Sequence, residues 1–161
     1  MALVAGDPAL PPELAAEVVV DEPLVIAVSH GDVLARRKTV TLDAIRDRAL
    51  ISLPPGTGLR TYLDDACASA GFRPRIAFEV ADPRMVAQLA GLSLGVALLP
   101  ESVTRAHPAS LQAVPLVRPR LRGRIALAWR AGQPASPAAR AFLSHARTRL
   151  TRPGTPAAGR P

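Results

Sequence analysis

A serine between two glycines lies at residues 91–95, with the sequence Gly-Leu-Ser-Leu-Gly. In α/β-hydrolases this pattern needs a strand before the serine and a helix after it, so that the hydroxyl stands above the sheet edge. Here the order is reversed, because a helical pattern precedes Ser93 and a buried-strand pattern follows it. A serine hydrolase that uses Ser93 is therefore the least favoured alternative, and we expect the chain not to be an enzyme.

A second glycine-flanked residue, Thr57, lies in Gly56-Thr57-Gly58 between a predicted strand and a predicted helix. The N–H groups and dipole at the start of a helix favour an anion. The segment lacks the lysine of the nucleotide-cradling motif and the third glycine of the dinucleotide fingerprint, so a nucleotide is not indicated. The Thr57 hydroxyl can hydrogen-bond a carboxylate, which makes this turn a candidate ligand clamp. The alternative is a tight turn without a ligand.

The other reactive side chains indicate structure rather than a reaction. Cys67 falls on the apolar stripe of its predicted helix, where free cysteine behaves as a small core residue. Asp64 and Asp65 are adjacent and project about 100° apart, so they do not converge as a paired acid and base. The three histidines have no metal-ligand spacing. We therefore expect neither a metal nor a cofactor.

The elements that must position these residues follow from periodicity and turn chemistry. Between residues 49 and 99 the order strand, helix, strand, helix, strand is typical of a parallel sheet with right-handed crossovers. Expected strands cover residues 1–6, 18–20, 24–28, 49–53, 75–80, 95–99, 112–116 and 125–129. Expected helices cover residues 41–47, 59–70, a segment from Pro83, 101–105 and 136–150, with a loop at residues 10–17. Thr41 and Asp82 are expected N-caps, and Gly71 is the expected C′ residue.

Charge is distributed unevenly along the 161-residue chain, whose formal net charge is +7. All 13 acidic residues lie at or before Glu101, whereas eleven arginines follow it, beginning with Arg105. This asymmetry could indicate a nucleic-acid-binding arm. Aromatic residues make up only 3% of the chain, so there is no platform on which bases could stack. We expect a solvated or partner-covered face instead.

The composition predicts a globular chain, because 48% of the residues are apolar. The single cysteine excludes an internal disulfide and is consistent with a reducing compartment. The N-terminus lacks the basic and apolar regions of a signal peptide, and no stretch approaches the roughly 20 apolar residues of a membrane span. We therefore expect a soluble, cytoplasmic protein that does not contact a membrane.

Five short segments follow one another along the chain: Glu22-Pro23-Leu24-Val25, Leu42 to Arg46, Pro54-Pro55-Gly56-Thr57-Gly58-Leu59-Arg60, Ala70-Gly71-Phe72-Arg73-Pro74 and Leu94-Gly95-Val96-Ala97-Leu98-Leu99-Pro100. In this order and with these spacings they closely resemble the effector-binding region of LysR-type transcriptional regulators, over about residues 1 to 150. The resemblance implies an α/β fold like that of type 2 periplasmic binding proteins. In that fold two lobes are joined by crossover strands, and a small-molecule effector binds in the cleft.

The resemblance also implies a division of the chain. Residues 1–29 would form the remainder of lobe one and the first crossover, and residues 30–95 the second lobe. Residues 96–150 would form the return crossover and the C-terminal part of lobe one, followed by a disordered tail at residues 151–161. The family's winged helix-turn-helix and the first part of its lobe one have no counterpart here. We therefore expect a truncated lobe one, which would favour self-association, and DNA contact only through a domain absent from this chain.

The effector-binding residues that the resemblance implies are Gly56, Thr57, Gly58, Leu59, Val80, Ala81 and Asp82. The expected function is effector sensing in a bacterial LysR-type regulator, where lobe closure on a small molecule, with a carboxylate as the candidate class, modulates transcription. The full-length form is expected to be a homo-oligomer. The alternative is a solute-binding protein of a transporter, which predicts an export signal that is not visible.

Overall fold

The computed structural model describes residues 2–5, 11–131, 137–138, 141 and 144–145. The chain divides into two compact units, one of residues 1–21 with 124–161 and one of residues 22–123. The described part of the predicted helix at residues 136–150 is helical, but most of that helix lies outside the described residues, as does the predicted tail at 151–161. The lobe boundaries that the resemblance implies stay a prediction.

The unit of residues 22–123 is built on a mixed sheet in which β4 lies between β5 and β6 and is parallel to both, as predicted. On the other side of β6, strand β2 pairs antiparallel with β6 and with β7, and β3 pairs parallel with β7. The strands are β2 (Leu14–Ser29), β3 (Val40–Thr41), β4 (Leu50–Ser52), β5 (Ile76–Glu79), β6 (Val96–Pro100) and β7 (Leu111–Arg118).

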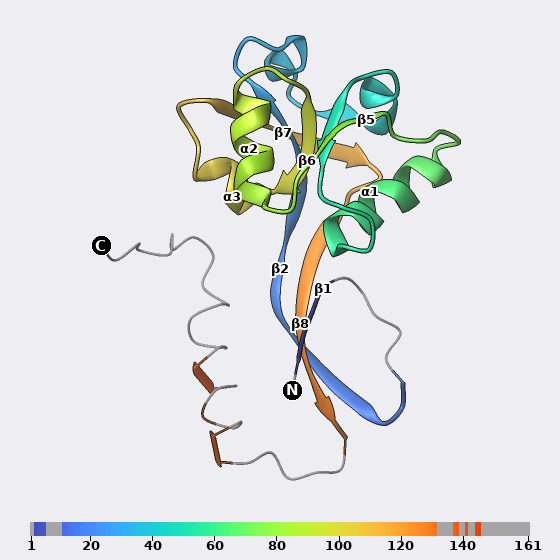
Figure 1. Cartoon of the computed structure of the whole chain (residues 1–161), viewed down its shortest axis with the longest axis vertical. Coiled ribbons are helices and arrows are strands. Elements are labelled where there is room, and N and C mark those ends of the chain that lie inside the picture. Colours follow the sequence, from blue (N-terminus) through green and yellow to red (C-terminus); the bar gives the residue numbers. More distant parts are fainter. Residues whose placement is uncertain (1, 6–10, 132–136, 139–140, 142–143, 146–161) are drawn as a thin grey trace. The chain divides into compact units, whose positions relative to one another are not determined.

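Helices α1 (Gly58–Ser69) and α2 (Pro83–Gly91) connect the three parallel strands and cover opposite faces of the sheet (Figure 1). Alternate residues of the strands supply the two cores. Ile26 and Leu50 pack with the α1 side, whereas their neighbours Ala27 and Ile51 pack with the α2 side. Because both faces are covered, the central strands β4 and β6 are buried along nearly their whole length and show no alternation of buried and exposed residues.

Local sequence sets where these two helices begin and end. The Asp82 carboxylate accepts from the backbone N–H of Arg84 at 2.8 Å, with Pro83 at the first helical position, so the predicted cap of α2 is confirmed. Gly71, at φ +77°, follows the end of α1 in the left-handed conformation that glycine adopts without strain. The predicted helix over residues 41–47 is a shorter 3-10 turn, Leu42–Ile45, and Thr41 makes no side-chain cap because it still belongs to strand β3.

The N-terminal strand pattern was predicted wrongly. Residues 10–17 were expected to be a loop and residues 18–20 and 24–28 two separate strands, but β2 is continuous from Leu14 to Ser29. Pro23 does not interrupt it, since the fixed φ of proline fits extended backbone and costs only one donor. The residue directly after Pro23 is again hydrogen-bonded, since the N–H of Leu24 donates to the carbonyl of Leu121 at 3.0 Å.

The smaller unit contains the predicted N-terminal strand. β1 (Ala2–Ala5) pairs antiparallel with β8 (Arg122–Arg130), with Ala2 opposite Ala128. Within this unit Arg124 Nε lies 3.6 Å from an Asp21 carboxylate oxygen. A five-residue helix, α3 (Glu101–Arg105), follows β6 in the larger unit as expected. None of the helices among the described residues is long and apolar enough to cross a membrane.

Candidate functional site

The turn after β4 contains the first group of predicted site residues. Gly56 has φ +85°, a conformation that a side chain would strain. The Thr57 hydroxyl donates to the carbonyl of Pro54 at 2.8 Å, and the Thr57 N–H approaches the same oxygen at 3.3 Å. Thr57 occupies the N-cap position of α1 without a side-chain cap hydrogen bond. The first-turn N–H groups of α1, which have no partner inside the helix, are thus left for another acceptor.

The loop after β5 contains the second group. The N–H of Val80 donates to the carbonyl of Ser52 at 3.1 Å, which continues the pairing of β5 with β4. Ala81 and Asp82 are exposed, and the Asp82 side chain is used as the cap of α2. Because β4 and β5 are parallel neighbours, both segments follow carboxyl ends at one edge of the sheet. The structure therefore brings the seven predicted residues to one edge, but the side chains of Leu59 and Val80 pack against the core there.

The same edge of the sheet shows how a carboxylate binds at a helix start. β6 is parallel to β4, so its carboxyl end also lies at this edge, and α3 begins there. The Glu22 carboxylate accepts from the backbone N–H and from the hydroxyl of Ser102, both at 2.9 Å. The start of α3 is therefore occupied by a carboxylate of this chain, whereas the N-cap residue of α1, Thr57, makes no side-chain cap hydrogen bond.

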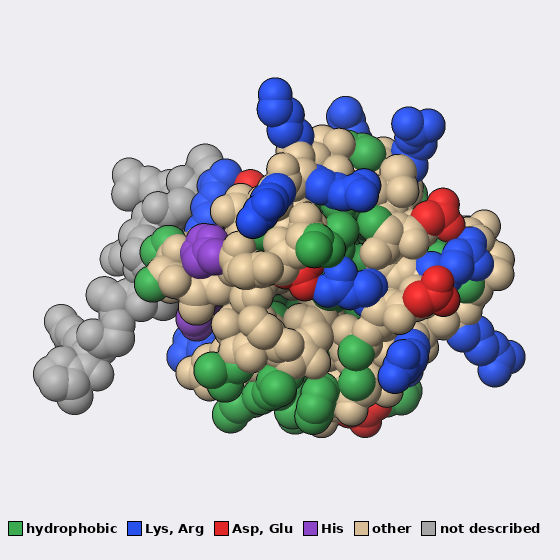
Figure 2. Space-filling model, turned by 90° about the horizontal axis from the view of Figure 1, so that it is seen from above, with side chains coloured by type: hydrophobic (Ala, Val, Ile, Leu, Met, Phe, Trp, Pro, Cys, Tyr) green, Lys and Arg blue, Asp and Glu red, His purple; other side chains and the backbone are tan. Residues whose placement is uncertain are grey.

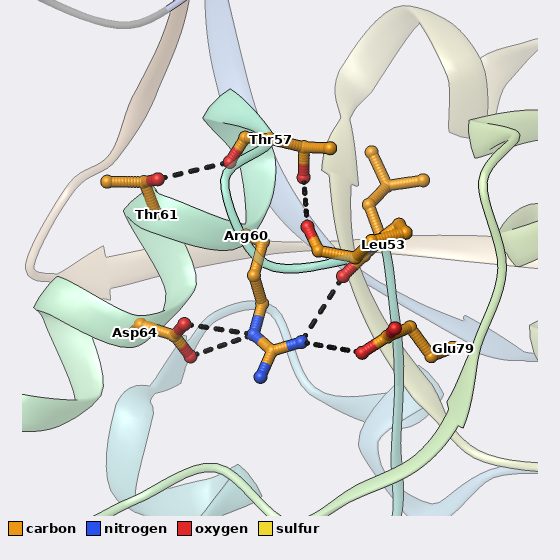
Figure 3. A network of polar contacts seen from close by, with 7 residues as sticks. Leu53, Thr57, Arg60, Thr61, Asp64 and Glu79 are labelled. Atoms are coloured by element: carbon orange, nitrogen blue, oxygen red, sulfur yellow. Dashed lines mark hydrogen bonds and ion pairs between the residues drawn. The ribbon is translucent and has the colours of Figure 1, made fainter.

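Arg60, which was not among the predicted site residues, links the two groups (Figure 3). Its Nε lies 3.0 and 2.9 Å from the two carboxylate oxygens of Asp64, one helical turn further along α1. Its Nη1 lies 3.3 Å from the carbonyl of Leu53 and 3.3 Å from a carboxylate oxygen of Glu79. The Arg-to-Asp spacing of four residues was a visible signal for a helix pair. Nothing in the spacing indicated Leu53 or Glu79.

The remaining candidates for chemistry have structural roles in the described residues. Ser93 follows a helix and precedes a strand, the reverse of a nucleophile elbow, and its hydroxyl donates to that of Ser29 at 2.8 Å. It adopts φ +63°, which lets the chain turn sharply after α2. Cys67 is fully buried, and desolvation, with a smaller contribution from Asp64, raises the pKa of its thiol from 9.0 to about 11. Such a thiol is a poor nucleophile at neutral pH.

No group of three or more His, Cys, Asp or Glu side chains among the described residues could hold a metal ion. Asp64 is paired with Arg60, and its neighbour Asp65 is exposed, as expected for residues that do not form an acid–base pair.

Residues 1–151 match the sequence model described as the LysR substrate binding domain. The chain belongs to this family. This LysR substrate-binding domain is 32% identical over 136 residues to the HTH-type transcriptional regulator YwbI of Bacillus subtilis (strain 168), a match that covers 84% of the chain and 45% of YwbI. The chain spans about half the length of the curated relatives it matches. The predicted family is thus confirmed, and because it is a family of regulatory domains, so is the prediction that the chain is not an enzyme.

Solved structures confirm the fold class of this LysR substrate-binding domain. The regulatory domain of CcmR from Synechocystis PCC6803, solved in complex with 2-PG, has a TM-score of 0.79 at 20% identity, covering 92% of this chain and 72% of that one. The effector-binding domain of QuiR, solved in complex with shikimate, has a TM-score of 0.78 at 22% identity, covering 92% and 71%. At these identities the likeness carries the fold alone.

Proposed function

We propose that the edge formed by residues 56–59 and 80–82 binds the small-molecule effector of a LysR-type transcriptional regulator. The observation that carries this proposal is the convergence of the two segments at the carboxyl ends of adjacent parallel strands. Ligands of open α/β sheets bind at such edges. Family membership supplies the class of function, and the geometry supports these residues as the contacts.

A small carboxylate is the ligand class that this edge favours. The open N–H groups at the start of α1 suit an anion, and Glu22 makes this kind of contact at the start of α3. Homologous domains have been solved with 2-phosphoglycolate and shikimate, and both molecules carry a carboxylate. Thr57 would add a hydroxyl contact, but its proton is held by Pro54 in the structure, so an effector must compete for it.

In the proposed mechanism the effector stabilises one arrangement of the two lobes over another. A ligand can shift this equilibrium only by the difference between its affinities for the two arrangements. The shift would reach DNA through a winged helix-turn-helix outside this chain, in a cytoplasmic, homo-oligomeric regulator. The effector then acts on transcription by changing how attached DNA-binding domains are held.

Calorimetric titration of the full chain with a panel of small carboxylates, including shikimate and 2-phosphoglycolate, tests the proposal. Each carboxylate is paired with its uncharged primary amide, and we expect binding of at least one carboxylate and not of its amide. In Thr57→Val the affinity should fall about tenfold, as for a lost hydrogen bond to a charged group. Thr61→Val is the matched control, since the Thr61 hydroxyl bonds to the Thr57 carbonyl on the same helix.

No heat from any member of the panel would contradict ligand binding by this chain. Equal affinity for carboxylate and amide would contradict the anion site, and equal loss in the two threonine variants would contradict a direct contact by Thr57.

A further inference from the structure

Four contacts of Arg60 join three separate elements of the larger unit. Its guanidinium is tied to Asp64 on α1, to the carbonyl of Leu53 after β4, and to Glu79 at the end of β5. Figure 3 shows the side chain extending from the start of α1 toward Glu79, between the helix and the strand ends. A single cation thus connects a helix with the ends of two strands.

The setting of Arg60 favours one fixed orientation. Its side chain is only 14% exposed, and it lies between two carboxylates. The two contacts of Nε with Asp64 fix the plane of the guanidinium, since arginine donates in a rigid, planar geometry. Nη1 is thereby aimed at Leu53 and Glu79. The contacts are charge-assisted, which makes them stronger than hydrogen bonds between neutral groups.

The two strand contacts fall beside the proposed effector contacts. Leu53 directly precedes Pro54, whose carbonyl holds the Thr57 hydroxyl, and Glu79 directly precedes Val80. Strand pairing alone fixes these segments weakly, because β4 has three residues and its register with β5 shifts between Leu50 and Ile51. Arg60 adds a cross-link at the point where the short ladder ends.

We propose that Arg60 is a positioning residue that fixes the turn of residues 54–59 relative to the loop of residues 80–82. This inference rests on the proposed function for its effect on effector binding. The geometric part stands without a ligand. Arg60 acts through the Pro54–Thr57 turn and through the backbone of Val80, and its cationic charge is already balanced by Asp64 and Glu79.

Amide hydrogen exchange of the ligand-free full chain, followed by NMR, tests the geometric part directly. The reporters are the N–H groups of Thr57 and Val80, which bond to Pro54 and Ser52. In Arg60→Gln we expect both to exchange about tenfold faster, because the lost contacts are hydrogen bonds to charged groups. Arg60→Lys keeps the charge without the planar geometry and should restore only part of the protection, and it remains available if Arg60→Gln does not fold.

Arg46→Gln is the matched control for general loss of stability. Arg46 also joins two elements, since it pairs with Asp43, donates to the carbonyl of Ala70 at 3.2 Å and lies over the ring of Phe72 at 4.5 Å. These contacts are at the opposite end of α1. We expect the amide exchange rates of Thr57 and Val80 in Arg46→Gln, compared with those of the other amides of the same variant, to be the same as in the wild type. Glu79→Gln removes only the negative charge from the link to β5 and should affect Val80 more than Thr57.

The outcomes separate this inference from the proposed function. Unchanged protection of Thr57 and Val80 in both Arg60 variants, or equal acceleration in Arg46→Gln, would overturn the positioning role. Faster exchange without binding of any carboxylate would support the positioning role and overturn the proposed function. If a carboxylate binds, Arg60→Gln and Thr57→Val should have non-additive effects on its affinity, whereas Arg46→Gln and Thr57→Val should be additive.

Discussion

Thr57 and Arg60 lie three residues apart at the start of α1, and their side chains contact different segments. Thr57 contacts the preceding turn, and Arg60 contacts the strand ends. The Thr57 hydroxyl folds back onto Pro54 and leaves the first turn of the helix without a side-chain cap. Arg60 turns away from that first turn toward the strand ends. Thr57 therefore leaves the first-turn N–H groups of α1 without a side-chain cap. The backbone of the same turn is held by the contacts of Arg60 with Asp64, Leu53 and Glu79.

Cys67 gives a pH-dependent prediction at the same scale. Its pKa is raised by burial from 9.0 to about 11, with Arg46 acting in the opposite direction. Because the folded-state pKa lies above the unfolded one, the protonated thiol stabilises the fold fully below about pH 9, and this contribution is lost as the pH rises through 11. We expect a loss of roughly 2–3 kcal/mol in the free energy of unfolding over this window.

Urea unfolding of the wild type and Cys67→Ala at pH 8 and pH 11 measures this loss. The variant removes the titrating group, so the stability of the wild type should fall relative to the variant as the pH rises. A constant difference between the two proteins across the window would show that the thiol pKa is not raised.

Sequence spacing identified residues that act within one element and missed those that act between elements. Cys67 was predicted as a core residue because it lies on a helical stripe, and Asp82 as a cap because it precedes Pro83. Arg60 was missed, since its partners Leu53 and Glu79 are 7 and 19 residues away and meet it only through the sheet. Sequence spacing identifies contacts between residues three or four positions apart on one helix, which is about one turn.

At the scale of elements, the βαβ alternation was predictable and the exact course of β2 was not. Both crossover helices have an apolar stripe and a stop signal, and α2 also has a side-chain cap. Parallel strands with both faces covered are apolar runs bounded by turn residues. β2 contains Asp21, Glu22 and Pro23 in its middle, which by composition indicate a break. Its continuity depends on pairing partners more than 70 residues away, such as Pro100 opposite Leu24, which local sequence does not show.

The cap of α2 gives a prediction at this scale. Asp82→Ala removes the acceptor for the N–H of Arg84, and loss of such a cap costs about 1 kcal/mol. Asp82→Asn keeps an acceptor and should retain most of the stability. Thermal unfolding monitored by circular dichroism measures both variants, with Asp65→Ala as the control for loss of an exposed carboxylate. Equal melting temperatures for Asp82→Ala and the wild type would show that the cap does not stabilise α2.

At the scale of the whole molecule, the excess of arginine does not form one patch on the face seen in Figure 2. Lys and Arg side chains are scattered over this face, separated by other residues and in places next to acidic ones. Part of the charge is compensated locally, as in the pairs Arg46–Asp43 and Arg105–Glu101. On this face the described cations are therefore dispersed rather than gathered into a single basic patch.

This distribution predicts the DNA affinity of the chain. With a net charge of +7 and exposed cations such as Arg36, Arg37 and Lys38, we expect weak binding to duplex DNA at low salt. The binding should be independent of base sequence and be lost by about 0.2 M NaCl, because it comes from counterion release at a few phosphates. Fluorescence anisotropy with two labelled duplexes of unrelated sequence, across a salt series, measures it. Replacing Arg36, Arg37 and Lys38 by Gln should lower the slope of log affinity against log salt concentration by at most about 3. A preference for one duplex that persists at high salt would contradict the prediction, because it would show that the chain itself recognises a base sequence.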